Sequence, residues 1–359
     1  MSERFCIIMA GGVGSRFWPL SKEEKPKQFI DVLGNGKSFI RQTYERMLLL
    51  VDAENIFVAT NAQYKDLVKE HIPELTDNQI ILEPLRRNTA PCIAYATHKL
   101  KAINKNAVVM VVPSDHYIAN KQQFVSVLKD GCDFAEKNDS LVTIGINPTH
   151  PETGYGYIQM TEDNISDTIY KVKTFTEKPN LEMAQVFIES GEFLWNSGMF
   201  IWSIKSITKA FMKYQPDIEY AFEQGADLYN TTDEKRFVER VFSECVNVSI
   251  DYAIMEKASN VYVIKASFVW SDIGTWESLY DYSPKTGRGN VLSSTEDIYV
   301  YDTSDSIISL PKGKVAVIEG LDNFIVAESD NVLMICPRGN ERNIKLYSDM
   351  HTSKKNRLP

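Results

Sequence analysis

Short apolar runs with β-type composition alternate with helical patterns over the first 146 residues, and this alternation constrains the fold more than any other feature. Strands are predicted at residues 5–10, 56–60, 79–82, 107–112 and 141–146, and helices at residues 39–51, 62–71, 91–104 and 122–137. The alternation predicts an α/β fold, namely a Rossmann-like, mainly parallel sheet with helices on both faces. Ligands bind such sheets beyond the carboxyl ends of the strands, so the residues that follow each strand are the first candidates for a site.

The first predicted strand runs directly into a glycine-rich turn, GGVGSRFWPL at residues 11–20, and PKQF follows at residues 26–29. Glycines let backbone amides close on phosphate oxygens, and Arg16 and Lys27 can neutralise the charge that these amides hold. A P-loop needs Lys-Ser or Lys-Thr after its last glycine, where this chain has Ser-Arg. A dinucleotide-binding turn needs glycine or alanine where this chain has Phe17. The turn is therefore a phosphate cradle of another type.

Two carboxylates follow apolar strands in similar settings. Asp115 ends the run VVPSD, and Asp272 precedes a glycine turn in WSDIGTW. An aspartate is a hard oxygen ligand that suits Mg²⁺, and two such loops can share one cation. Taken alone, Asp115 is better explained as the start of a turn or the cap of the next helix.

Three further motifs offer groups that bind sugars or phosphates. Glu177 can accept paired sugar hydroxyls, and the adjacent Lys178 can pair with a phosphate. Gly154 lets the backbone approach a sugar ring, and Asn196 can both donate and accept hydrogen bonds. The structural alternatives are a surface ion pair before a proline, a hairpin turn, and a strand start that places Trp195 in the core.

In this order, the motifs between residues 5 and 280 resemble those of the sugar nucleotidyltransferase family. FWPLS at residues 17–21 and PKQF at residues 26–29 resemble the branch of mannose-1-phosphate guanylyltransferases, or GDP-mannose pyrophosphorylases. The resemblance implies a Mg²⁺-dependent transfer of GMP from GTP to α-D-mannose 1-phosphate, which yields GDP-mannose and pyrophosphate. It also implies a short left-handed β-helix at the C-terminus and a homodimer.

The resemblance implies a role for each candidate residue. The expected catalytic residues are Arg16, Lys27 and Lys178. The expected nucleotide-binding residues are Ala10, Gly11, Gly12, Gly14, Ser15, Glu83, Asn88, Thr89 and Asp115. The expected sugar-binding residues are Gly154, Glu177, Asn196 and Asp272, and the expected metal ligands are Asp115 and Asp272. Glu83 belongs to the expected base-side loop, where its carboxylate could accept the N1–H and N2–H₂ donors of guanine.

A turn-rich segment at residues 283–290 divides the sequence into two predicted domains. Residues 1–283 are expected to form the nucleotidyltransferase catalytic domain, and residues 290–359 a small all-β, β-helix-like domain. The second domain carries none of the charged candidates, so we expect it to have a structural or assembly role. The sequence has no room for the phosphomannose isomerase domain of longer family members, so only transferase activity is expected.

The formal net charge of −9 argues against a nucleic-acid-binding protein, which needs a basic face. The five cysteines are far apart and lack metal-binding spacing, so they are interpreted as reduced thiols. No apolar run has membrane-spanning length and the N-terminus lacks a signal-peptide pattern, which together predict a cytoplasmic protein.

Two other functions remain open on the sequence alone. One is another sugar-1-phosphate nucleotidyltransferase, such as a thymidylyl or uridylyl transferase acting on glucose 1-phosphate. The other is a non-catalytic sugar-nucleotide sensor. The presence of Arg16, Lys27, Asp115, Lys178 and Asp272 together disfavours the sensor, which does not need the full set of charges.

Overall fold

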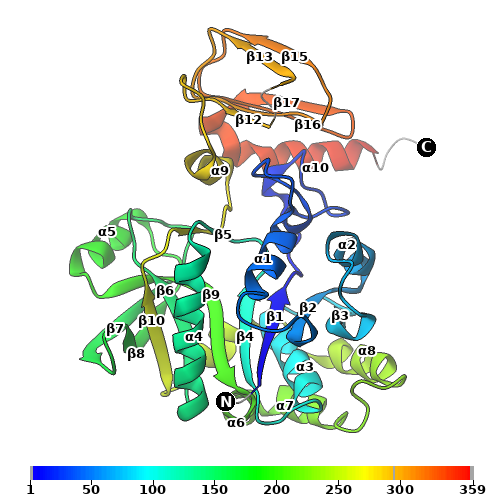
Figure 1. Ribbon diagram of the computed structural model, residues 1–359, viewed down its shortest axis with the longest axis vertical. Helices are drawn as coiled ribbons and strands as arrows, with labels where there is room; N and C mark the ends of the chain where they lie inside the picture. Colours follow the sequence, from blue (N-terminus) through cyan, green and yellow to red (C-terminus); the bar gives the residue numbers. More distant parts are fainter. Residues whose placement is uncertain (1–2, 294–295, 356–359) are drawn as a thin grey trace. The chain divides into compact units, whose positions relative to one another are not determined.

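The computed structural model describes residues 3–293 and 296–355, with the backbone alone at Ser15, Asp163 and residues 352–355 (Figure 1). The chain forms two compact units, and each is composed of several segments. The first unit contains Met1–Gly11, Thr43–Ser114 and Ile118–Trp270. The second contains Gly12–Gln42, Asp115–Tyr117 and Ser271–Pro359.

The first unit is built on a nine-stranded sheet in the order β3-β2-β1-β4-β9-β6-β10-β8-β7. The strands are β1 (Arg4–Met9), β2 (Ile56–Asn61), β3 (Ile80–Glu83), β4 (Val108–Pro113), β6 (Leu141–Ile146), β7 (Tyr157–Asn164), β8 (Ile169–Thr176), β9 (Phe193–Ser203) and β10 (Val261–Ala266). The five strands predicted over the first 146 residues are all confirmed to within two residues at each end. Short strands β5 (Tyr117–Ile118) and β11 (Trp270–Ser271) lie where the chain passes from one unit to the other.

Helices cover both faces of this sheet, as predicted (Figure 1). They are α2 (Lys65–His71), α3 (Thr89–Lys101), α4 (Lys121–Lys137), α5 (Leu181–Ser190), α6 (Ile204–Tyr214), α7 (Pro216–Glu223), α8 (Glu234–Glu244) and the π-helical turn η6 (Asp251–Met255), while α1 (Phe39–Met47) leads into the unit. Successive residues of β9 contact the helices on opposite faces of the sheet. Ile201 contacts α4 where Gly131 leaves space, whereas Phe200 and Trp202 pack into the core formed with α3, α6 and α8.

The prediction of a mainly parallel sheet is only partly correct. Strands β3, β2, β1 and β4 pair parallel to one another, and β6 pairs parallel to β10. Strand β9 lies between β4 and β6 and is antiparallel to both, and the hairpin β7–β8 adds further antiparallel pairs. The sheet is therefore mixed. The hydrophobic pattern of a buried strand is the same in both directions, so the sequence could not reveal the reversal.

The second unit contains the glycine-rich turn and the C-terminal residues. Its elements are η1 (Ser15–Phe17), η2 (Lys27–Phe29), α9 (Trp276–Tyr282), β12 (Val291–Leu292), β13 (Ile298–Tyr301), β14 (Ile307–Ser309), β15 (Ala316–Glu319), β16 (Phe324–Ser329), β17 (Val332–Pro337), η7 (Arg338–Asn343) and α10 (Ile344–Lys355). Figure 1 shows α10 running along the layer that contains β16 and β17.

The C-terminal strands form two small layers, β12-β14-β16-β17 and β13-β15. Parallel pairing joins Ile307 to Ile325 and Ile298 to Ala316, so the chain returns to the same position after 18 residues. Strand β17 departs from this coil, because it pairs antiparallel to β16. The β-rich character of residues 290–359 is confirmed, whereas the left-handed β-helix stays a prediction.

One apolar core joins the glycine-rich turn to the C-terminal strands within the second unit. Phe17 is fully buried, and its ring centroid lies 5.3 Å from that of Trp276. The same cluster contains Trp18, Phe39, Ile273, Leu279, Ile307, Ile325, Ala327, Met334, Cys336 and Ile344. The division at residues 283–290 stays a prediction about domains. In the folded chain, the predicted phosphate cradle is packed by residues that lie about 300 positions later.

We predict that Phe17→Ala destabilises the protein by about 3–5 kcal/mol, because it leaves a cavity in this shared core. Urea denaturation of the full chain measures the loss. Tyr299→Ala is the control, because Tyr299 is 50% exposed on β13 and its truncation should change the unfolding free energy little. Equal effects of the two substitutions would contradict the role of the shared core.

Candidate functional site

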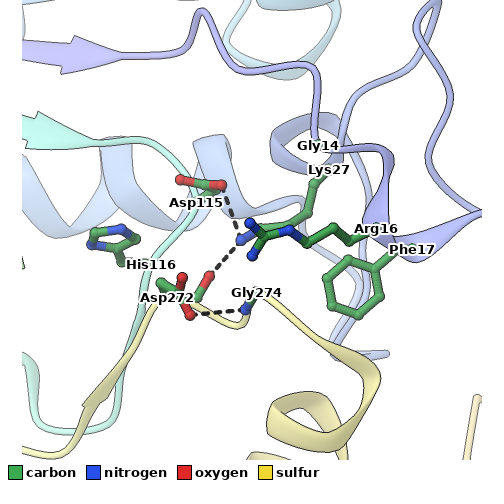
Figure 2. Close-up of a pocket in the computed structure, with 8 residues that line it drawn as sticks. All are labelled: Gly14, Arg16, Phe17, Lys27, Asp115, His116, Asp272 and Gly274. Atoms are coloured by element: carbon green, nitrogen blue, oxygen red, sulfur yellow. Dashed lines mark hydrogen bonds and ion pairs between the residues drawn. The ribbon is translucent and has the colours of Figure 1, made fainter. Parts of the chain in front are cut away.

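The second unit contains a pocket that brings together five of the sequence-predicted site residues (Figure 2). Its lining consists of Gly14, Arg16, Phe17, Lys27, Asp115, His116, Asp272 and Gly274. The residues come from three distant segments: the glycine-rich turn and η2, the loop after β4, and the turn between β11 and α9. Two cations and two carboxylates thus converge in one small volume, as the sequence predicted.

Lys27 is the most enclosed charge in this pocket, with only 6% of its surface exposed. Its ammonium lies 2.9 Å from Oδ2 of Asp115. It also donates to the backbone carbonyl of Asp272 at 2.5 Å (Figure 2). A second backbone carbonyl, that of Ile273, accepts from the same ammonium at 3.1 Å. Lys27 therefore connects the two carboxylate-bearing loops to the segment that follows the glycine-rich turn.

The Asp115 carboxyl titrates below its ordinary range. Burial alone would raise its pKa, but the positive charges of Lys27 and His116, with hydrogen bonds from Lys27 and the backbone, lower the pKa overall. The group is thus held as a carboxylate, the form in which it can bind a cation.

The turn that carries Asp272 is strained and tightly packed. Ile273 is fully buried and has φ of 42°, which is unusual for a β-branched residue. The amide of Gly274 donates to Oδ1 of Asp272 at 2.9 Å. A Cβ at position 274 would lie 2.8 Å from Asp272 Oδ2 and 3.1 Å from Arg16 Nη1, so Gly274 lets the guanidinium approach this turn.

Gly14 allows a similar close approach on the other side of the pocket. Its φ is 50°, and a Cβ at this position would lie 2.7 Å from Cβ of Lys27. A side chain at position 14 would therefore be strained and would displace Lys27. By contrast, no described atom lies within 4 Å of the position a Cβ would take at Gly12.

The expected base-side residues belong to the first unit, together with Ala10 and Gly11. Glu83 ends β3 and is 7% exposed, and its Oε2 lies 3.3 Å from the position a Cβ would take at Gly11. Burial raises the pKa of the Glu83 carboxyl to about 7, although the Cys92 thiol and the charge of Arg86 act in the opposite direction.

Asn88 and Thr89 have structural roles at the start of α3. Asn88 has φ of 64°, and its side chain accepts a hydrogen bond from the Thr89 amide at 2.8 Å. The Thr89 hydroxyl accepts a hydrogen bond from the Ile250 amide at 2.8 Å. Both side chains thus fix the backbone at the N-terminus of α3, and a contact with the nucleotide stays a prediction for each.

The expected sugar-side residues also belong to the first unit. Glu177 and Lys178 are exposed after β8, and Gly154 donates its amide to Glu152 at 2.6 Å. Asn196 donates its side-chain amide to Asp251 Oδ1 at 2.8 Å and its backbone amide to Gly156 at 2.8 Å.

Asp251 is a polar neighbour of this group that the motif analysis did not include. Burial raises its pKa, the hydrogen bond from Asn196 lowers it, and the negative charge of Glu177 raises it further. Asp251 lies at the start of the π-helical turn η6, a local geometry that is frequent at functional sites.

A buried charge cluster elsewhere in the first unit could also hold a metal ion. His98, Glu219 and Glu223 have ligand atoms within 4.8 Å of one another. However, His98 Nε2 lies 3.2 Å from Glu219, and Lys101 lies 2.8 Å from Glu223. We interpret the cluster as a polar network between α3 and α7, in which Lys101 already pairs with Glu223.

A family model described as nucleotidyl transferase matches residues 5–289, which is most of the chain. The chain belongs to the nucleotidyl transferase family. An Escherichia coli protein named mannose-1-phosphate guanylyltransferase is 38% identical over 347 residues, which cover 94% of this chain and 74% of that protein. A protein of the same name from Salmonella montevideo is 39% identical over 91% of this chain and 70% of its own length.

A solved structure from Thermus thermophilus resembles this nucleotidyl transferase over nearly its whole length. It is described as a mannose-1-phosphate geranyltransferase, is 27% identical, and has a TM-score of 0.86. The match covers 98% of this chain and 99% of the other. The similarity thus includes the C-terminal residues that lie beyond the family model.

We predict that Gly14→Ala destabilises this nucleotidyl transferase by about 1–3 kcal/mol, because alanine is strained at positive φ. The substitution should also lower turnover, since the new Cβ displaces Lys27. Gly12→Ala tests the specificity of the effect, because its new methyl group meets open space and should leave the melting temperature unchanged. Thermal melts of both variants provide the comparison, and equal melting temperatures for Gly14→Ala and wild type would contradict it.

We also predict a pH dependence of stability that originates at Glu83. Its pKa is raised from 4.5 to about 7, so the folded state binds this proton more tightly than the unfolded state does. The resulting stabilisation is fully present below pH 4.5 and is lost as the pH rises through about 7. Its upper limit is about 3 kcal/mol.

Glu83→Gln removes this titration, so denaturation curves at several pH values provide the test. The unfolding free energy of the wild type, relative to that of the variant, should fall between about pH 5 and pH 8. Parallel pH profiles for the two proteins would show that Glu83 keeps an ordinary pKa.

Proposed function

We propose that this chain transfers GMP from GTP to α-D-mannose 1-phosphate and releases pyrophosphate. The pocket that contains Arg16, Lys27, Asp115 and Asp272 carries the proposal, because phosphoryl transfer needs concentrated positive charge and a cation site next to a phosphate cradle. The relatives named mannose-1-phosphate guanylyltransferase, at 38–39% identity, supply the substrate pair.

The reaction forms one bond and breaks one. An oxygen of the sugar phosphate attacks the α-phosphorus of GTP, and the bond from that phosphorus to the β-phosphate oxygen breaks in line. No general base is required, because a phosphate monoester with a second pKa of about 6 is mostly dianionic at neutral pH. Catalysis therefore depends on positioning and on compensation of negative charge.

We assign the charge compensation to named groups. Arg16 and the backbone amides of residues 11–15 bind the leaving phosphates. Lys27 neutralises nucleotide phosphates and keeps the two carboxylate loops together. Lys178 pairs with the incoming sugar phosphate, while Glu177, Asn196 and Gly154 orient the mannose. Glu83 accepts hydrogen bonds from guanine, with Asn88 and Thr89 shaping the backbone beside it.

Asp115 and Asp272 would hold the divalent cation, which we propose to be Mg²⁺. The pocket lining fits such an ion, because both groups are hard oxygen donors and Asp115 is held as a carboxylate. When bound, the cation supplies positive charge to the phosphates. The three contacts of Lys27 hold together the two loops that carry these carboxylates.

We propose further that the protein acts in the cytoplasm as a homodimer and that its 18-residue coil is a left-handed β-helix. Among the described helices, none is both long and apolar enough to cross a bilayer. Exposed apolar side chains on the C-terminal strands, including Val315, Val317, Leu333 and Ile335, offer a surface on which two copies could associate.

The substrate assignment predicts that GTP with mannose 1-phosphate gives the highest kcat/KM. Pyrophosphate release over a matrix of four nucleoside triphosphates and several sugar 1-phosphates measures it. Arg16→Gln is the matched variant, and it should lower kcat by about 10²–10³, because it removes one preorganised charge contact. A clearly better substrate pair would refute the assignment, and near-wild-type turnover of Arg16→Gln would refute the role of the cradle.

The metal assignment predicts that Asp115→Asn and Asp272→Asn each abolish activation by Mg²⁺ while the proteins still unfold cooperatively. The reason is that each substitution replaces an anionic ligand with a neutral amide. Activity titrations with Mg²⁺ and after EDTA treatment provide the measurement. Full activity in EDTA, or unchanged Mg²⁺ titrations in both variants, would contradict the assignment.

A further inference from the structure

The short helix η7, which follows the last strand, is attached to helix α9 by a pair of opposite charges. Arg338 is only 8% exposed and donates two hydrogen bonds to the carboxylate of Glu277, at 2.6 and 3.2 Å. It also donates to the Asp305 carbonyl at 2.8 Å, and its guanidinium lies 3.5 Å from the ring centroid of Tyr280. These contacts fix the orientation of η7 against α9.

Glu341, on the same short helix, binds the N-terminus of α9. Its Oε2 accepts a hydrogen bond from the Glu277 amide at 3.2 Å, and its carboxylate also accepts one from the Trp276 amide. The next amide, that of Ser278, is capped by Thr275 at 3.0 Å. The first-turn amides of α9 therefore all have acceptors, and a negative charge lies at the positive end of the helix.

The helix that Glu341 holds begins directly after the turn of the candidate site. Asp272 and Gly274 line the pocket, and Thr275 is the N-cap of α9. A displacement of the first turn of α9 would therefore move the Asp272 carboxylate. Glu341 belongs to the β-rich segment of residues 290–359, which we call the C-terminal module. It does not line the pocket, but through α9 it is placed to affect the position of a proposed metal ligand.

Burial raises the pKa of the Glu341 carboxyl above its ordinary value. The hydrogen bonds from the Glu277 and Trp276 amides lower this pKa, the negative charge of Glu277 raises it, and the positive charge of Arg16 lowers it. The two amide hydrogen bonds, rather than the distant charges, define where the carboxylate lies.

We propose that Glu341 is a positioning residue for nucleotidyl transfer: it holds the first turn of α9, and with it the Asp272 turn. This inference rests on the proposed function. It gives the C-terminal module a part in forming the site, in addition to the structural or assembly role expected from the sequence.

The first test is Glu341→Gln, which keeps a carbonyl oxygen for the two amides but removes the charge. We expect kcat to fall about five-fold, the effect of losing one charge interaction at a helix terminus, with an unchanged KM for mannose 1-phosphate. Glu319→Gln makes the same charge change on exposed β15 and should behave as wild type. The assay uses the best substrate pair found in the matrix, so a wrong substrate assignment does not remove the test.

The second test is a double-mutant cycle with Asp272→Asn, because a residue that acts by placing the Asp272 carboxylate loses its effect once that carboxylate is gone. Glu341→Gln should therefore lower kcat in the wild type but little further in Asp272→Asn. Amide hydrogen exchange needs no substrate, and the first turn of α9 should exchange faster in Glu341→Gln than in the wild type. Fully multiplicative effects on kcat, unchanged exchange in α9, or an equal loss in Glu319→Gln would overturn the proposal.

Discussion

The buried ammonium of Lys27 is the contact on which the candidate site depends. A cation with 6% exposure is stable only if anions and carbonyl oxygens surround it, and Asp115, Asp272 and Ile273 provide them. These partners lie on two loops that are more than 150 residues apart in sequence. Because one ammonium binds both loops, it joins the backbone of the Asp272 turn to the Asp115 carboxylate. The protein thus preorganises the charge that phosphoryl transfer requires.

The packing of the second unit also helps to hold the charged residues of the site in place. The glycine-rich turn is too short to form a core from its own residues. Phe17 and Trp18 anchor it in a core completed by strands β14, β16 and β17. We therefore expect the proposed phosphate cradle to be rigid only when the C-terminal residues are folded, and this shared core accounts for the place of both segments in one compact unit.

Much of this arrangement could be predicted from the sequence. The alternation of strands and helices gave the α/β architecture, and the rule that ligands lie beyond strand ends brought Asp115 to the same place as Arg16 and Lys27. These features follow from local patterns. The converging motifs also resembled one family strongly enough to name it before the fold was known.

Other features could not be predicted, because they depend on long-range packing. A hydrophobic pattern does not indicate the direction of a strand, so the antiparallel pairing of β9 could not be predicted. The bonds of Lys27 to two backbone carbonyls, the link between Asn196 and Asp251, and the cap that Glu341 provides for α9 all join residues distant in sequence. The sequence shows which side chains are charged, but it does not show which residues they bind.

Amide hydrogen exchange in Lys27→Gln tests most directly whether Lys27 sets the geometry of the site. Our account predicts faster exchange in the Asp272 turn and at the start of α9 than in the wild type, because the turn loses the ammonium that binds its carbonyls. Exchange in the central strands β1 and β4 should stay the same and serves as the internal reference. Unchanged exchange in the Asp272 turn would contradict the account.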